Sequence, residues 1–188
     1  KETDAATYQA MEALVHNLNT MNSRAGAQVP FSSLNYGTDT SPEGRMAVHN
    51  LLRATEAGLG DGETPIFPVQ IFKVKEGVNY NEGDPNYDLF RHALRCSAKR
   101  LFPNFSFLDA PFNLQYYKPG DYNTEVAYMG CRTRVMGNVF DNTKEVTCGR
   151  GNLSFTSINL PRIGIEAKGD MKTFYKLLDE KIALVEEQ

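Results

Sequence analysis

The stretch Pro65-Ile-Phe-Pro-Val-Gln-Ile-Phe-Lys-Val74 decides the fold. Its apolar character is nearly continuous, which is typical of a parallel strand that is covered on both faces. We therefore expect a buried strand here, in a sheet whose neighbouring strands run in the same direction.

Two further strands are expected on either side of this one, at residues 28–36 and 105–112. The three strands begin near positions 29, 66 and 105, with a helical pattern in each interval. This regular alternation of strands and helices is typical of right-handed βαβ units. The fold class is therefore predicted to be α/β, with parallel strands that alternate with helices.

Helix signals fill the intervals between the strands. Apolar residues recur at helical spacing over residues 8–21. Ser41 and Pro42 predict the start of a second helix, and Gly58 its end. A third helix is expected after Asp84 and Pro85, and a last one, capped by Asp170, after a fourth strand at residues 155–165.

Composition limits the function classes. The chain has 188 residues, a size that suits one domain or one large piece of a longer protein, and its formal net charge is −3 without any run of Lys or Arg. These features argue against a nucleic-acid or membrane partner. Three cysteines without a CxxC pair favour a reducing cytoplasm over a disulfide scaffold or a zinc site. Because the chain opens on Lys1 and closes on Gln188 within a helical pattern, we expect an excised fragment.

Residues 113–152 form a long segment rich in Gly, Asn and Asp, with Cys131 between Gly130 and Arg132. Compact domains rarely keep such a length of loop without a function. We therefore expect a loop that carries a reactive thiol, although an inert small hydrophobic side chain is the common alternative. The three histidines fall in helical stretches, so no Cys/His couple is indicated. Cys96, in a predicted helix, is expected to be inert.

Polar residues Ser33 and Asn35 are unusual for a buried strand. Side chains of a barrel strand alternate between the interior and the outer layer, so both are candidate substrate contacts from the barrel interior. A simple transition from strand to turn explains them equally well. The sequence Gly149-Arg-Gly-Asn152 indicates either a close approach to a ligand or an ordinary turn.

Several stretches, in order, resemble the central part of the anaerobic (class III) ribonucleoside-triphosphate reductases. The resemblance covers essentially the whole chain but only a minor internal part of that family's length. The stretches that carry it are Gln28-Val-Pro-Phe-Ser-Ser-Leu-Asn-Tyr-Gly-Thr38, Pro65-Ile-Phe-Pro-Val-Gln-Ile-Phe-Lys73, Gly77-Val-Asn-Tyr-Asn-Glu-Gly-Asp-Pro-Asn-Tyr87, Asn104-Phe-Ser-Phe-Leu-Asp109, Met129-Gly-Cys-Arg-Thr-Arg134 and Gly149-Arg-Gly-Asn152.

The resemblance implies a ten-stranded α/β barrel of two parallel halves, of which this chain would be about half, in one catalytic fragment spanning residues 1–188. It implies that residues 113–152 are a finger loop through the barrel. Cys131 would form the thiyl radical that abstracts the 3′ hydrogen of the substrate ribose. Asn152 would hydrogen-bond that ribose, and Met129 and Gly130 would line the tip of the loop.

The resemblance also implies partners. The full-length protein would be a homodimer with a glycyl radical, zinc and ATP or deoxynucleotide effectors, activated by a radical-SAM enzyme and supplied with electrons by formate or a thiol system. None of these cofactors is expected in this fragment. We expect the fragment alone to be inactive, and to self-associate or to have a disordered finger loop.

Two alternatives remain open. The chain could be a stand-alone or degenerate relative with a binding role. It could also keep a glycyl-radical mechanism with acyl or dehydratase chemistry, but a pyruvate formate-lyase type of site has two adjacent cysteines, whereas Cys131 stands between Gly130 and Arg132.

Overall fold

The computed structural model describes residues 1–22, 25–130, 133–135, 141, 149 and 156–188. The chain divides into two compact units, Lys1–Cys148 and Gly149–Gln188, and each is described by itself.

The first unit is built on a three-stranded parallel sheet in the order β1 (Ser33–Tyr36), β2 (Val69–Val74) and β3 (Asn104–Phe107). Asn35 pairs in register with Ile71, and Ile71 with Asn104. The α/β class and the three strands predicted from the sequence are confirmed. Each strand is shorter than predicted, and both β2 and β3 begin directly after a proline, which cannot donate to the ladder.

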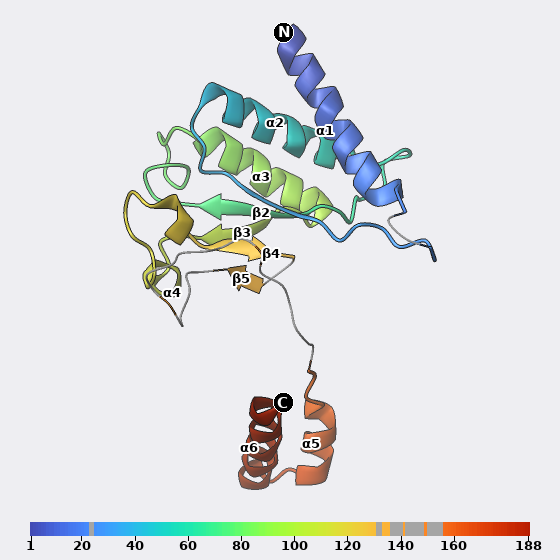
Figure 1. Ribbon diagram of the computed structural model, residues 1–188, viewed down its shortest axis with the longest axis vertical. Coiled ribbons are helices and arrows are strands. Elements are labelled where there is room, and N and C mark those ends of the chain that lie inside the picture. Colours follow the sequence, from blue (N-terminus) through green and yellow to red (C-terminus); the bar gives the residue numbers. More distant parts are fainter. Residues whose placement is uncertain (23–24, 131–132, 136–140, 142–148, 150–155) are drawn as a thin grey trace. The chain divides into compact units, whose positions relative to one another are not determined.

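Three helices accompany this sheet: α1 (Glu2–Thr20), α2 (Pro42–Ala57) and α3 (Tyr87–Arg100). The predicted start of α2 is confirmed, since Ser41 Oγ accepts a hydrogen bond from Gly44 N at 3.1 Å. Gly58 ends α2 with φ 87°, as its position predicts. Figure 1 shows α2 and α3 along one side of the sheet and the β4–β5 hairpin on the other.

The main core lies between the sheet and helices α2 and α3. Phe72 of β2 is fully buried, and its ring lies 5.8–6.0 Å from the rings of Tyr36, Phe90 and Phe105. Cys96 of α3 belongs to the same cluster, with Sγ 3.7 Å from Leu52 O. The inert role expected for Cys96 agrees with this buried position.

A chain of buried hydrogen bonds crosses this core. The Tyr36 hydroxyl donates to Gln70 Oε1 at 2.6 Å, and Gln70 Nε2 donates to Thr55 Oγ1 at 2.8 Å. Thr55 Oγ1 in turn donates to Leu51 O at 2.8 Å. Because buried polar groups are costly unless they are paired, this relay fixes β1, β2 and α2 in one register.

Alkaline pH is expected to destabilise this unit through two of its core residues. Burial, with the nearby Glu56 carboxylate, raises the pKa of the Cys96 thiol to about 11, and burial raises the pKa of Tyr36 well above its ordinary value. Because the pKa of the Cys96 thiol is higher in the folded chain than in the unfolded chain, the protonated thiol stabilises the fold. This contribution is complete below the ordinary thiol pKa of 9.0 and is lost as the pH rises through about 11.

Urea unfolding midpoints measured between pH 8 and pH 11 check this expectation. The Cys96→Ala variant should lose less stability over that range than the unmodified chain. The control Tyr122→Phe changes a tyrosine that is 82% exposed and should leave the slope unchanged. An equal slope in all three proteins contradicts the prediction.

The segment after β3 is more regular than the loop that we expected over residues 113–152. It contains the short helix α4 (Pro111–Leu114), the 3-10 helix η1 (Tyr122–Thr124) and the strands β4 (Ala127–Met129) and β5 (Thr133–Val135). β4 and β5 pair antiparallel, with Met129 opposite Thr133. The expected irregular loop therefore contains a hairpin.

The second unit contains α5 (Leu160–Ala167) and α6 (Met171–Glu187), which pack as a helical hairpin. The strand predicted over residues 155–165 is wrong. Asn159 Oδ1 accepts from Arg162 N at 3.0 Å and Pro161 lies in the first turn, which together form a helix start. Asp170 is confirmed as the cap of α6, since its carboxylate accepts from the backbone N–H groups of Lys172 and Thr173.

Candidate active site

The sheet of the first unit has a polar face opposite its helices. Tyr36 and Phe72 point into the core under α2 and α3, so the residues that alternate with them face the other side. Ser33 and Asn35 of β1 and Lys73 of β2 lie on this face. Their polar groups contact the segment that leads into and through β4.

Asn35 binds β4 through both ends of its amide group. Asn35 Nδ2 donates to Tyr128 O at 2.7 Å, and Asn35 Oδ1 accepts from Tyr128 N at 2.8 Å. Two residues earlier, Ser33 Oγ accepts from Gly130 N at 3.1 Å. The two side chains therefore hold the backbone of the hairpin directly before Cys131 in the sequence.

A third contact fixes the start of this segment. Lys73 Nζ lies 2.7 Å from Glu125 Oε1, and the two side chains are only 13% and 10% exposed. An ion pair so far removed from water must stay paired, because either charge alone would carry a large desolvation cost.

Ser106 of β3 pairs in register with Lys73, and its buried hydroxyl has no hydrogen-bond partner in the described part of the chain.

A second group of polar side chains lies past the carboxyl ends of β2 and β3, where α/β sheets often bind ligands. Glu76 N donates to Asp109 Oδ2 at 2.7 Å, and Arg134 Nη1 donates to Asn113 Oδ1 at 3.1 Å. Lys75 Nζ lies 3.3 Å from the Tyr117 hydroxyl. The cavity beside them measures about 40 Å³, so these groups mainly bind one another, and the bond to Arg134 secures β5.

Gly130 has a conformation that suits a glycine. Its φ is +65°, and a Cβ at this position would lie 3.1 Å from Cε1 of Phe31. A larger residue would therefore be strained both by its backbone and by this contact. The glycine lets the chain turn closely against β1 at the end of β4.

The structure brings together four of the six residues predicted for the site. Ser33 and Asn35 lie on the polar face and Gly130 is bonded to Ser33, while Met129 lies in β4 between Tyr128 and Gly130. The other two, Cys131 and Asn152, lie outside the described residues.

The sequence did not predict two features of this site. These are the backbone of Tyr128 as the partner of Asn35, and the ion pair between Lys73 and Glu125. A signal for the pair did exist, because Lys73 is the only charged residue in the apolar stretch from Pro65 to Val74.

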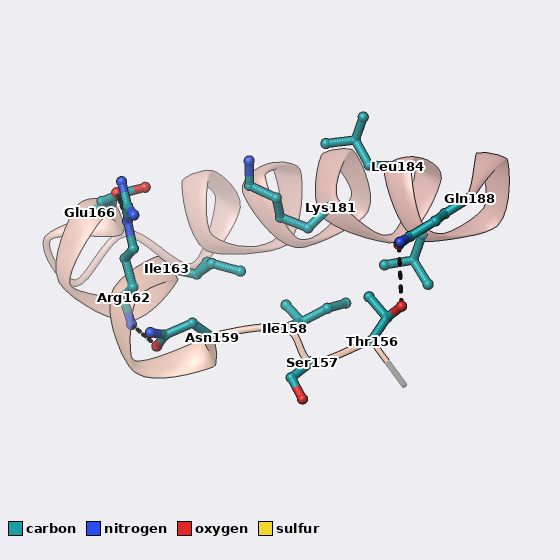
Figure 2. Close-up of a pocket in the computed structure, with 11 residues that line it drawn as sticks. Thr156, Ser157, Ile158, Asn159, Arg162, Ile163, Glu166, Lys181, Leu184 and Gln188 are labelled. Carbon is teal, nitrogen blue, oxygen red and sulfur yellow. Dashed lines mark hydrogen bonds and ion pairs between the residues drawn. The ribbon is translucent and has the colours of Figure 1, made fainter. Parts of the chain in front are cut away.

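A second hollow lies in the helical hairpin of the second unit. This cavity measures about 370 Å³ and lies between α5, α6 and residues 156–159. Figure 2 shows the apolar side chains of Ile158 and Ile163 on its inner side. Thr156 Oγ1 donates to Gln188 Oε1 at 3.2 Å at one end. The ion pair Arg162–Glu166 beside it is exposed on the surface. The polar face of the sheet is therefore the stronger candidate site.

Within the described ranges, no three His, Cys, Asp or Glu side chains gather as metal ligands. The same part of the chain has no helix that is long and apolar enough to cross a bilayer.

Comparison with known proteins identifies the family. The family model described as anaerobic ribonucleoside-triphosphate reductase matches residues 1–188. The enzyme of that name from Escherichia coli (strain K12) is 39% identical over 178 residues, which are 94% of this chain and 24% of that protein. The corresponding protein of Enterobacteria phage T4 is 34% identical over 188 residues, or 97% of this chain and 30% of that protein.

The chain spans about a quarter of the length of these relatives. Both the resemblance in the sequence and the family match extend from one end of the chain to the other. The chain therefore belongs to the anaerobic ribonucleoside-triphosphate reductase family.

Proposed function

We propose that this chain is the central part of the catalytic barrel of an enzyme that reduces ribonucleoside triphosphates to deoxyribonucleoside triphosphates. The observation that carries the proposal is the β4–β5 hairpin, which is held over the polar face of the parallel sheet and has Cys131 between its strands in the sequence. In the complete barrel, of ten strands, that face would line the interior.

The reaction assigns a role to each site residue. Cys131, as a thiyl radical, takes the 3′ hydrogen of the ribose and becomes a thiol. The 2′ hydroxyl takes up a proton and leaves as water. The reductant, formate or a thiol, supplies two electrons, a second proton completes the C–H bond at the 2′ carbon, and the Cys131 thiol returns its hydrogen to the 3′ carbon. Asn152 would hydrogen-bond the ribose, and Met129, Gly130, Ser33 and Asn35 would line the space around it.

The remaining parts belong to the longer protein. A glycyl radical, when present, supplies the unpaired electron that Cys131 carries during turnover. The radical-SAM activating enzyme, the zinc site, the ATP or deoxynucleotide effectors and the homodimer are proposed for the full-length enzyme, which would act in the cytoplasm to supply DNA replication. No described residue of this chain is assigned to them.

Anaerobic reduction assays test the proposal. The activated full-length protein should convert a ribonucleoside triphosphate to its deoxy form in the presence of formate or a thiol reductant. The 188-residue chain alone, given the same reagents, should produce none above background. Turnover by the isolated chain contradicts the expected inactivity, and a full-length protein without deoxynucleotide product contradicts the proposed reaction.

A further inference from the structure

We propose that Ser33 and Asn35, here called the hairpin anchor, are positioning residues that set how far the β4–β5 hairpin extends along the sheet. They would act through the loop backbone, in addition to any substrate contact. The geometry of the anchor stands by itself, and only its consequence for catalysis rests on the proposed function.

The first argument is the chemistry of Asn35. Its amide donates to Tyr128 O and accepts from Tyr128 N, at 2.7 and 2.8 Å, so it pairs with this residue as a neighbouring strand would. Without such a partner, the backbone N–H and C=O groups at the edge of a strand have no hydrogen bond within the sheet. A carboxylate of the same size could accept but not donate, and an alkyl side chain could do neither.

The second argument is register. Ser33 binds Gly130 while Asn35 binds Tyr128, so the numbering rises along β1 and falls along β4. The hairpin strand thus runs opposite to β1 and is fixed at two alternate residues. A shift by one residue would break both contacts, because the backbone N–H and C=O groups of successive residues in a strand point to opposite edges.

The third argument is distance. One residue of extended strand spans about 3.3 Å. Reacting atoms in an enzyme are held about 3–3.5 Å apart, and a misplacement of about 1 Å costs up to ~100-fold in rate. A slip of the hairpin by a single residue would therefore remove Cys131 from reach of the ribose, which gives the anchor a direct effect on the chemical step.

The contacts at the base of the hairpin do not replace the anchor. The pair Lys73–Glu125 holds a residue three positions before Tyr128, and Asn113 holds Arg134 on the other strand. The first contact fixes the chain before β4, and the second holds the side chain of Arg134, which pairs with Tyr128 from β5; neither binds the backbone of β4. In the described part of the chain, Ser33 and Asn35 are the side chains that hydrogen-bond the backbone within the last three residues before Cys131.

Hydrogen exchange of the full-length protein, without substrate, tests the anchor. In Asn35→Ala, the peptide that contains Tyr128 and Gly130 should exchange at least about tenfold faster, because two hydrogen bonds are lost. Asn35→Asp keeps the acceptor for Tyr128 N and loses only the donor to Tyr128 O, so it should speed exchange less than Asn35→Ala, and Ser33→Ala should affect mainly the amide of Gly130. Ser33→Thr keeps the hydroxyl and should retain most of the protection.

Asn19 provides a matched control. Its Nδ2 donates to Phe67 O, and its Oδ1 accepts from the N–H groups of Ile66 and Phe67, which is the same chemistry at another loop. Asn19→Ala should speed exchange at residues 66–67 and leave Tyr128 protected. Unchanged exchange at Tyr128 and Gly130 in a folded Asn35→Ala protein overturns the proposal, and Ser33→Ala serves the same test if Asn35→Ala does not fold.

Kinetics separate positioning from substrate binding. Asn35→Ala should lower kcat by roughly 10–100-fold, with KM little changed and the glycyl radical content intact. A raised KM with normal kcat would instead assign the side chain to substrate binding and overturn the positioning role. If the unmodified full-length protein fails to reduce nucleotides, the proposed function fails, while the exchange result still decides the anchor.

Discussion

Replacing Cys131 by serine in the full-length protein is expected to abolish nucleotide reduction while the glycyl radical still forms. Serine has nearly the same size, but its O–H bond is too strong to yield its hydrogen to a glycyl radical. The loss should be at least ~10³-fold, the scale found when a reacting group is removed from an enzyme. Deoxynucleotide formation and the electron paramagnetic resonance signal of the radical are the two measurements.

Cys96 offers the matched control for this substitution. It lies in α3, buried with Phe72 and Leu52 on the helix side of the sheet, whereas Ser33 and Asn35 hold the hairpin on the other side. Cys96→Ala should keep most of the activity wherever the protein stays folded. Activity retained in Cys131→Ser, or lost in a folded Cys96→Ala protein, would reject the assignment of the radical to residue 131.

Replacing Phe72 by alanine should cost about 3–5 kcal/mol of unfolding free energy, the range for a fully buried phenylalanine. Phe72 is 0% exposed and touches rings from β1, α3 and β3, so the cavity would open at the centre of the core. The shift of the urea unfolding midpoint, followed by circular dichroism, measures the effect.

Phe107 of β3 provides the comparison for Phe72. It belongs to the same sheet but is 53% exposed, so Phe107→Ala should cost no more than ~1 kcal/mol. A similar cost for both substitutions would show that the core does not centre on Phe72.

Local sequence signals predicted most of the fold of the first unit. The apolar run before Val74, together with Ser41, Pro42 and Gly58 around α2, specified the elements because each signal acts within a few residues. The same reasoning failed at residues 155–165, where the isoleucines suggested a strand. The cap at Asn159 and Pro161 started a helix instead, which shows that turn chemistry outweighed β-propensity.

The site was predictable only in part, for a physical reason. Strand alternation suggested Ser33 and Asn35 for an interior face, and both lie on the side of the sheet opposite α2 and α3, while their contact with a substrate stays a prediction. Their partners in the hairpin lie 93 and 97 residues away, and no local pattern encodes a hydrogen bond over that distance. The roles of Cys131 and Asn152 came from the resemblance to a family, and they stay predictions.

The relay from Tyr36 through Gln70 to Thr55 has a consequence for evolution. A single apolar replacement of Gln70 would leave the Tyr36 hydroxyl unpaired and would take from Thr55 Oγ1 the donor that it accepts from, whereas joint replacement of all members by groups of similar shape is nearly neutral. These three positions are therefore expected to change together between lineages or not at all. Correlated substitutions at the three positions would then indicate how β1 is aligned against β2.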